Sequence, residues 1–169
     1  MKNLYSVILG LISITLISTL LLSYLQNKTS LSASQSRAIR DSVLKLANIT
    51  AKDLSARGPT AWLNHFEDSP DFFMANEGTL AISSYHAAAL FIKDTLIKIM
   101  PKISLQWSAI HVYPLTSQIA VMAANFHEDV AGTSGKMTPY DGYFTATIHK
   151  TEKGWKFRNL HWSLRPGNN

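Results

Sequence analysis

The sequence predicts an α+β domain in which helices pack on one face of a sheet. Between residues 36 and 100 apolar residues recur at helical spacing, whereas four long segments after residue 103 alternate apolar and polar residues as strands do. Helices grouped before a meander of strands are the pattern of α+β domains. The chain contains no internal repeat and no low-complexity segment.

The first 34 residues differ in composition from the rest. Residues 7–25 carry no charge and consist almost entirely of Leu, Ile, Val, Ser and Thr, with Lys2 before them and Lys28 after them. At about 1.5 Å per residue, a helix of this length just crosses a bilayer core of about 30 Å. Small residues from Ser32 to Ser34 would also permit cleavage of a signal peptide. The alternative is a buried helix of a soluble protein.

These features divide the chain into two parts. We expect residues 1–34 to be a signal peptide or an N-terminal membrane anchor, and residues 35–169 to form the domain. The protein would then be exported (periplasmic or secreted), or held at the membrane by one N-terminal helix. A domain of this length is close to the commonest domain size and can build its own core.

The composition argues against two classes of function. The net charge is +5, and the basic residues are dispersed rather than gathered in a patch, so we expect no nucleic-acid partner. The chain has no cysteine, which excludes disulfides and thiolate chemistry.

Three helices are predicted at the start of the domain. The first runs from about Ser36 to Leu54, with an apolar stripe that includes Ile39 and Val43, and it stops at Gly58-Pro59. A short helix capped by Thr60 follows. The third begins after Ser83 or Ser84 and continues to about Met100.

The strands follow from alternation and from turn residues. A small hairpin is predicted around residues 76–78, between residues 72–74 and 79–82. The long strands are expected at residues 103–113, 118–128, 138–149 and 155–163. In the last strand Trp155, Phe157 and His161 share one parity, so a face that begins as core would become polar and line a pocket on a concave sheet.

Three motifs in this order of elements resemble those of a known superfamily. They are the aromatic short helix followed by residues 68–73, the step from Gly78 into the third helix, and the closing strand with Gly154-Trp155-Lys156-Phe157 and His161-Trp162-Ser163. Together they resemble the nuclear transport factor 2-like superfamily, especially its SnoaL-like branch. The resemblance implies a cone-shaped, curved, mostly antiparallel sheet around three helices (a cystatin-like roll), with a deep apolar pocket and often dimers through the sheet. Members include isomerases, cyclases, dehydratases and binding modules without catalysis.

Polar residues expected in the pocket are the candidates for catalysis. His161 is the first, because a histidine in a partly apolar pocket titrates near neutrality and can act as acid or base. Asp141 and His111 are the possible partners of His161. Structural roles, such as a core histidine bonded to a carbonyl or an aspartate in a turn or bulge, are the alternatives.

Aromatic and amide side chains are the candidates for ligand binding, because small-molecule pockets are mostly apolar with a few polar groups. The candidates are Trp62, Phe66, Phe72, Trp107, Asn125 and Tyr143. Membership of an ordinary core is the alternative for each aromatic residue.

The predicted function is the binding of a small hydrophobic molecule by an exported or membrane-tethered domain. The first alternative is an acid–base isomerase, cyclase or dehydratase that uses the pocket histidines and Asp141. The second is a non-catalytic dimeric assembly module. No cofactor and no metal are expected, although a metal site assembled across strands is an alternative. The strand at residues 118–128 is apolar on both faces, which favours a homodimer through the sheet.

Overall fold

The computed structural model describes residues 30–167. Residues from Ala33 onward form one compact unit, distinct from the first 32 residues. The signal peptide or anchor predicted within residues 7–25 lies outside the described residues. Among the helices within residues 30–167, none combines the length and hydrophobicity needed to cross a bilayer.

Helix α2 (Ala33–Arg57) is the longest helix of the domain. Its predicted apolar stripe is buried throughout, and Thr50 within that stripe donates its hydroxyl to the Leu46 carbonyl at 2.8 Å. Gly58, with φ +72°, lets the chain turn into the short 3₁₀ helix η1 (Pro59–Asn64). The first two predicted helices are therefore confirmed.

The third predicted helix is confirmed, with a widened turn inside it. It comprises α3 (Tyr85–Phe91), the π-helical segment η2 (Ile92–Leu96) and α4 (Ile97–Ile99). The Ser84 side chain caps the N-terminus of this helix, where its hydroxyl accepts a 3.2 Å hydrogen bond from the Ala87 backbone amide. π-helical turns occur most often beside functional sites.

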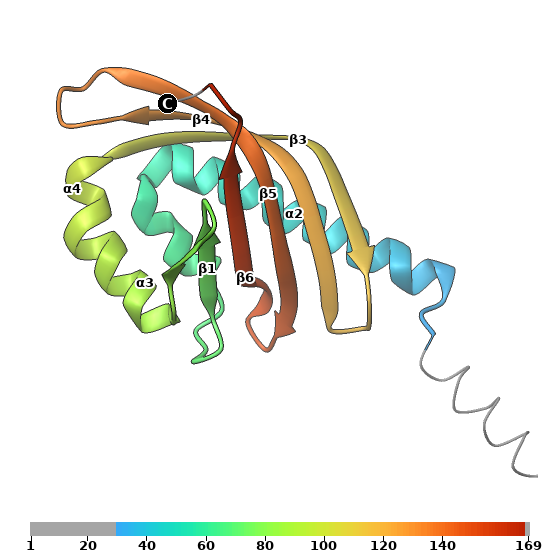
Figure 1. The fold of residues 1–169 in the computed structure, drawn as a ribbon. Helices are drawn as coiled ribbons and strands as arrows, with labels where there is room; N and C mark the ends of the chain where they lie inside the picture. Colours follow the sequence, from blue (N-terminus) through green and yellow to red (C-terminus); the bar gives the residue numbers. More distant parts are fainter. Residues whose placement is uncertain (1–29, 168–169) are drawn as a thin grey trace, which may run out of the picture. The chain divides into compact units, whose positions relative to one another are not determined.

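Six strands form one mixed sheet in the order β2-β1-β6-β5-β4-β3 (Figure 1). Their bounds are β1 (Phe73–Asn76), β2 (Thr79–Ile82), β3 (Lys102–Pro114), β4 (Ile119–Ala131), β5 (Met137–Thr151) and β6 (Gly154–Leu164). All neighbours pair antiparallel except β1 and β6, which are parallel. The sheet is curved, with α2 against its concave side (Figure 1). The predicted α+β class, hairpin and mostly antiparallel sheet are confirmed.

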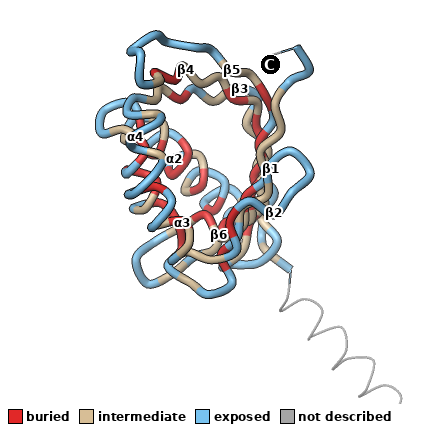
Figure 2. Tube along the Cα trace, turned by 60° about the vertical axis from the view of Figure 1, so that its left-hand side comes forward, coloured by how far each residue is buried: buried red, intermediate tan, exposed pale blue. Residues whose placement is uncertain are grey.

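The core lies between α2 and the concave face of the sheet, where the buried residues gather (Figure 2). Each long strand sends alternate side chains there, such as Met122, Phe144 and Phe157, all fully buried. The Trp107 indole nitrogen donates to the Ala47 carbonyl at 3.1 Å and so ties β3 to α2.

Two β-bulges decide which side chains face the concave side. In β6, Asn159 pairs with Thr147 and Phe157 with Ile148, so Arg158 is an extra residue. In β3 the register shifts between Ser108 and His111, around Ala109 with φ +48°. Because side chains alternate along a strand, one extra residue reverses the faces of all residues beyond it.

Candidate functional site

An apolar cavity of about 330 Å³ opens on the concave side of the sheet. Its walls come from η1, from β1 and β2, from the third helix and from β3 to β6. Most lining side chains are aromatic or aliphatic: Trp62, Phe66, Met74, Ile82, Phe91, Ile92, Leu96, Met100, Ile103, Phe126, Val130, Trp162 and Leu164. The polar lining residues are Asn76, Glu128 and Tyr140. This composition is that of a small-molecule site.

The aromatic walls are held by ring contacts. Trp62 stacks on Phe66 with ring centroids 5.2 Å apart and meets Trp162 edge-on at 5.3 Å. Phe126 in turn lies 6.3 Å from Trp162. Each such ring pair adds to the stability of the packed aromatic walls.

Glycine 142 makes room for the Phe126 ring. It lies directly across from Phe126 in the β4–β5 pair, and a Cβ there would lie 2.5 Å from the ring's Cζ. Gly142 is thus a mid-strand residue that lets the aromatic wall approach the backbone of β5.

Among the described residues that line the cavity, Glu128 alone has an acidic or basic side chain that titrates near neutrality. It is half-buried and pairs with Tyr140 across β4 and β5. Within residues 30–167 no basic group neutralises it, and burial alone raises the pKa of its carboxyl to about 7. The carboxyl can therefore gain or lose a proton at neutral pH while facing an apolar space.

Two of the predicted ligand-binding residues, Trp62 and Phe66, line this cavity. Trp107 and Phe72 do not. Trp107 is half-buried and packs against Phe144, at 4.9 Å between ring centroids, where β3 meets α2. Phe72 is fully buried between Phe66 and Tyr85 and belongs to the core.

Asn125 and Tyr143 lie on the convex side of the sheet. They pair across β4 and β5 and line a shallow recess of about 220 Å³ with the C-terminal residues. Their buried strand neighbours Ala124 and Phe144 occupy the concave side instead. The expectation that they face the pocket is wrong, because the odd-numbered residues of both strands point away from it.

The orientation predicted for His161 is wrong for a different reason. The extra residue Arg158 reverses the alternation, so Leu160 and Trp162 face inward and His161 is exposed on the convex side. The bulge in β3 acts in the same way: Trp107, before it, lies on the concave side, and His111, after it, lies on the convex side. Asp141, in the odd register of β5, also faces outward.

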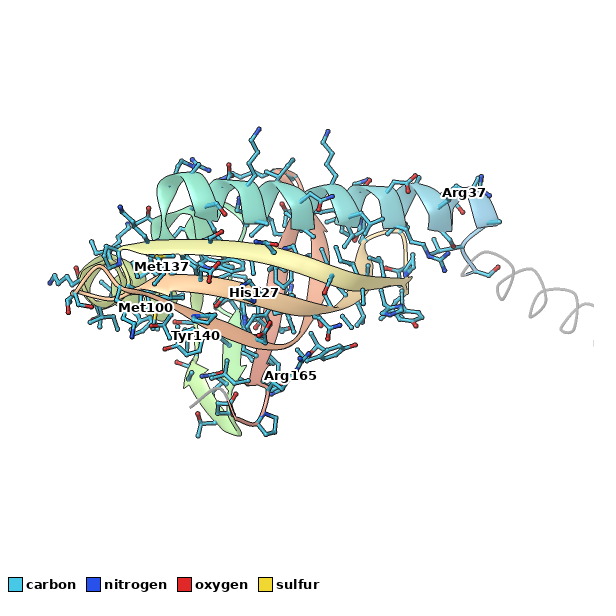
Figure 3. The ribbon with its side chains drawn as sticks, turned by 90° about the horizontal axis from the view of Figure 1, so that it is seen from above. Arg37, Met100, His127, Met137, Tyr140 and Arg165 are labelled. Carbon is cyan, nitrogen blue, oxygen red and sulfur yellow. The ribbon has the colours of Figure 1, made fainter. Side chains whose placement is uncertain are left out.

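Asp141 instead joins a cluster on the convex face with His127, whose Nδ1 lies 2.9 Å from the Asp141 Oδ1 (Figure 3 labels His127). Asp129 lies 3.5 Å from the other ring nitrogen. The Asp141 hydrogen bond, followed by the charges of both aspartates, raises the pKa of His127. The side chains of His127, Asp129 and Asp141 are each more than a third exposed, and none of the three lines the concave cavity.

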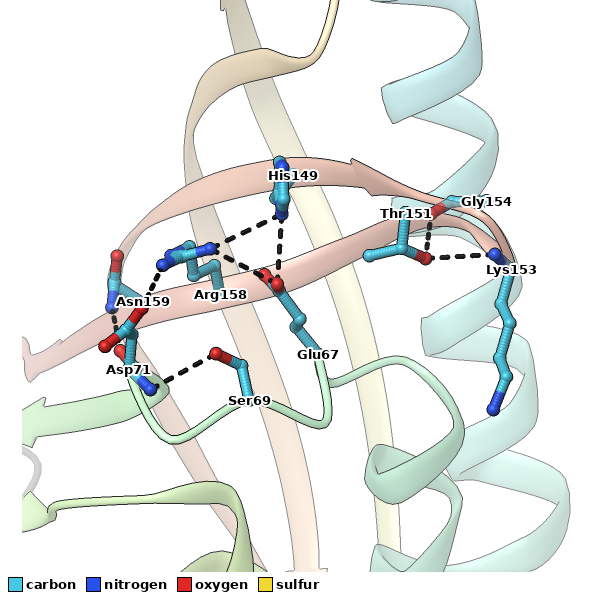
Figure 4. A network of polar contacts seen from close by, with 9 residues as sticks. All are labelled: Glu67, Ser69, Asp71, His149, Thr151, Lys153, Gly154, Arg158 and Asn159. Atoms are coloured by element: carbon cyan, nitrogen blue, oxygen red, sulfur yellow. Dashed lines mark hydrogen bonds and ion pairs between the residues drawn. The ribbon is translucent and has the colours of Figure 1, made fainter.

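A second polar network joins the loop after η1 to the sheet (Figure 4). Glu67 Oε1 lies 3.0 Å from His149 Nδ1 and 3.2 Å from Arg158, whose other nitrogen bonds Asp71 at 2.6 Å. The bulge at Arg158 thus turns its guanidinium towards two carboxylates. Glu67 Oε2 is buried and has no hydrogen-bond partner among the described residues.

A polar cleft of about 710 Å³ lies beside this network, between the loop after η1 and the β5–β6 turn. Its lining mixes Glu67, Asp68 and Glu152 with Lys150, Lys153 and Lys156. Burial and the nearby Lys153 lower the pKa of Lys156, which donates to the Asn64 carbonyl. Mixed charges of this kind neutralise one another, so we favour the apolar cavity as the ligand site.

Within the described part of the chain, no group of three His, Asp or Glu side chains is arranged to hold a metal ion.

Glu128 was not among the site residues predicted from the sequence, although one feature of the sequence pointed to it. It continues the parity of Ala120, Met122, Ala124 and Phe126, and Val130 follows, so a carboxylate interrupts an otherwise apolar face.

No protein-family model matches the chain, and no curated protein matches its sequence. Solved structures do match its fold. One is a nuclear transport factor 2-like superfamily protein from Salmonella enterica serovar Typhimurium, with a TM-score of 0.66 and 18% identity over 78% of this chain and 95% of that one.

Two further matches differ in what their names state. A nuclear transport factor 2-like protein of unknown function from Shewanella oneidensis has a TM-score of 0.58 and 14% identity over 73% of this chain and 98% of that one. A hexachlorocyclohexane dehydrochlorinase, LinA type 2, has a TM-score of 0.65 and 12% identity over 79% and 90% of the two chains. Identities this low establish a shared fold alone.

Proposed function

We propose that this chain, which has the nuclear transport factor 2-like fold, binds a small, largely apolar molecule in its concave cavity. The fold itself confirms the resemblance drawn from the three sequence motifs. The observation that supports the function is the cavity: about 330 Å³, walled by interlocked aromatic rings, with Asn76, Glu128 and Tyr140 as its polar groups. At interior packing density it holds about 250 Å³ of ligand.

Native mass spectrometry on the gently purified full-length chain tests this proposal. A co-purifying small molecule, lost when Trp62 or Phe126 is replaced by Ala, would support it. Thr145→Ala, on the convex face, is the matched control and should retain the molecule. A chain that carries no molecule and takes up no apolar probe in a titration would contradict the proposal.

The second candidate is an acid–base enzyme, and Glu128 is the observation that favours it. A carboxyl with a pKa of about 7 can exchange protons with a bound molecule at neutral pH. One matching structure is named a dehydrochlorinase, which supports this class without fixing the reaction. If the co-purifying molecule is turned over, Glu128→Gln should abolish turnover and keep binding. Equal turnover by this variant would exclude Glu128 as the acid or base.

Two further expectations remain proposals. Export or membrane anchoring rests on the uncharged run of residues 7–25, and fractionation of the expressing cell with N-terminal sequencing tests it.

Homodimer formation rests on the convex face of β4, where Ile119, Val121 and Ala123 remain partly exposed. Leu160 and Trp162 lie on the concave side of the sheet and contribute nothing to that face.

A further inference from the structure

We propose that the ligand of the concave cavity is a hydrophobic amine, whose ammonium group pairs with Glu128 while its apolar part fills the aromatic walls. This inference rests on the proposed function, because it names the chemical class that the cavity selects. It starts from a single mismatch: one carboxyl faces an otherwise apolar space.

Among the described residues that line the cavity, none has a basic side chain that could balance the Glu128 charge. Tyr140, across the strand pair, is the only other titratable lining residue, and Leu105 is the partner on β3. The third helix contributes Phe91, Ile92, Leu96 and Met100, and η1 contributes Trp62, none of which ionises. A carboxylate in such surroundings is costly unless a cation accompanies it, and a bound ammonium would supply that cation.

The cavity walls suit a cation as well as an apolar body. Six aromatic side chains line it: Trp62, Phe66, Phe91, Phe126, Tyr140 and Trp162. Aromatic faces attract ammonium groups, and the attraction grows when water is excluded. A neutral ligand would gain the same apolar contacts and leave the carboxylate without a counter-ion.

The carboxyl lies beside Tyr140. Glu128 and Tyr140 come from the ends of β4 and β5 that approach α4, and Figure 3 shows Met100 and Tyr140 towards that end of the molecule. Trp62 and Phe66, on and just after η1, also line the cavity. We therefore expect the amine beside Tyr140 and the apolar portion against the aromatic walls.

Proton linkage follows from the pairing. Near pH 6.5 Glu128 is largely protonated in the free protein, because its pKa is about 7. An ammonium ligand binds the ionised form, so its binding must release up to one proton from the carboxyl. A neutral ligand of the same shape releases none.

The test uses calorimetric titration of the full-length chain with 4-phenylbutylamine and with 4-phenylbutan-1-ol, a pair of probes that differ in charge. At pH 8 we expect the amine to bind about tenfold more tightly than the alcohol or better, the size of a charge-assisted hydrogen bond. Titration at pH 6.5 in two buffers of different ionisation enthalpy measures the released proton.

Glu128→Gln and Asp129→Asn form the matched pair of variants. Glu128→Gln keeps the side-chain shape and should reduce the amine preference to about one. Asp129→Asn removes the neighbouring carboxylate on the convex face and should leave the preference unchanged. If Glu128→Gln does not fold, the proton count on the unaltered chain decides.

The outcomes separate the two proposals. If the unaltered chain binds both probes equally and releases no proton with the amine, the amine inference is overturned and the apolar site stands. If neither probe binds, the proposed function fails as well. An amine preference that survives in Glu128→Gln would also overturn the assignment of the pairing to Glu128.

Discussion

At the scale of single residues, the most consequential group is the Glu128 carboxyl. An unfolded chain ionises it at the ordinary pKa of a glutamate, whereas burial holds the folded pKa at about 7. Between these two values the folded state binds more protons than the unfolded state, so stability falls as pH rises through this window. Above pH 7 the loss of folding free energy caused by the ionised Glu128 carboxylate reaches its full value. The residue is therefore kept at a cost to stability, as functional groups often are.

We expect Glu128→Gln to stabilise the protein above pH 7, where the ionised carboxylate costs the folded state on the order of 3 kcal/mol at most. Below pH 4.5 the gain should vanish, because the carboxyl is then protonated in both states. Urea unfolding followed by circular dichroism at pH 4, 6 and 8 measures the difference. Asp129→Asn is the control: it loses an ion pair with protonated His127 and should show no gain at any of the three pH values. A pH-independent effect of Glu128→Gln would contradict the raised pKa.

At the scale of elements, the bulge in β6 links the core to the polar network. Arg158 is the extra residue that lets Phe157 and Leu160 both face inward, three positions apart. It also carries the charge that Glu67 and Asp71 share. Arg158 thus determines which side chains of the second half of β6 lie on the concave side, and its ion pairs hold the loop after η1 against the sheet.

Deletion of Arg158 and its replacement by Ala should have very different costs. The deletion restores regular pairing and turns Leu160 and Trp162 outward, which we expect to cost roughly 4 kcal/mol or more. Arg158→Ala keeps the bulge and loses its ion pairs, which should cost about 1–2 kcal/mol because the partner Glu67 is buried. Chemical unfolding of both variants gives the comparison. Equal costs would show that the bulge does not determine the inward face.

Gly142 supports a second prediction at this scale. We expect Gly142→Ala to cost about 3 kcal/mol, because the new methyl group collides with the Phe126 ring and with the Ser163 carbonyl oxygen. The displaced ring should also narrow the cavity and weaken uptake of 4-phenylbutan-1-ol. Thermal unfolding and probe titration measure the two effects, with Thr145→Ala on the opposite face as control. A stable variant with unchanged uptake would mean that the ring yields without cost.

The helices and strands could be predicted from the sequence, whereas the side of the sheet on which each side chain lies could not. Helical spacing and turn residues such as Gly58 and Gly78 place the helices and strands within a few residues. A bulge has no comparable signal, because Arg158 and Ala109 are ordinary strand residues in composition. One inserted residue in β6 and another in β3 were enough to move His161 and His111, respectively, from the expected pocket to the convex face. Trp62 and Phe66, on and just after a short helix with no bulge before them, were placed correctly.

At the scale of the whole molecule, the convex face of the sheet remains to be explained. Its central rows pair Val121 with Thr147 and Ala123 with Thr145, so small and branched side chains cover the middle of β4 and β5. Such a surface is weakly polar. It could bury itself against a second copy related by a two-fold axis, in which each residue near the axis meets its own counterpart.

This geometry gives the final prediction. We expect a homodimer in solution, and Val121→Arg should convert it to a monomer, because two arginines would meet near the axis without a carboxylate between them. Light scattering coupled to gel filtration measures the mass. Leu80→Arg, at an exposed position of the edge strand β2, is the control and should leave the dimer intact. A monomeric unaltered chain at micromolar concentration would refute the dimer, and loss of the dimer in Leu80→Arg alone would move the interface to the sheet edge. The concave cavity lies on the other side of the sheet, so Val121→Arg should still take up 4-phenylbutan-1-ol in either case.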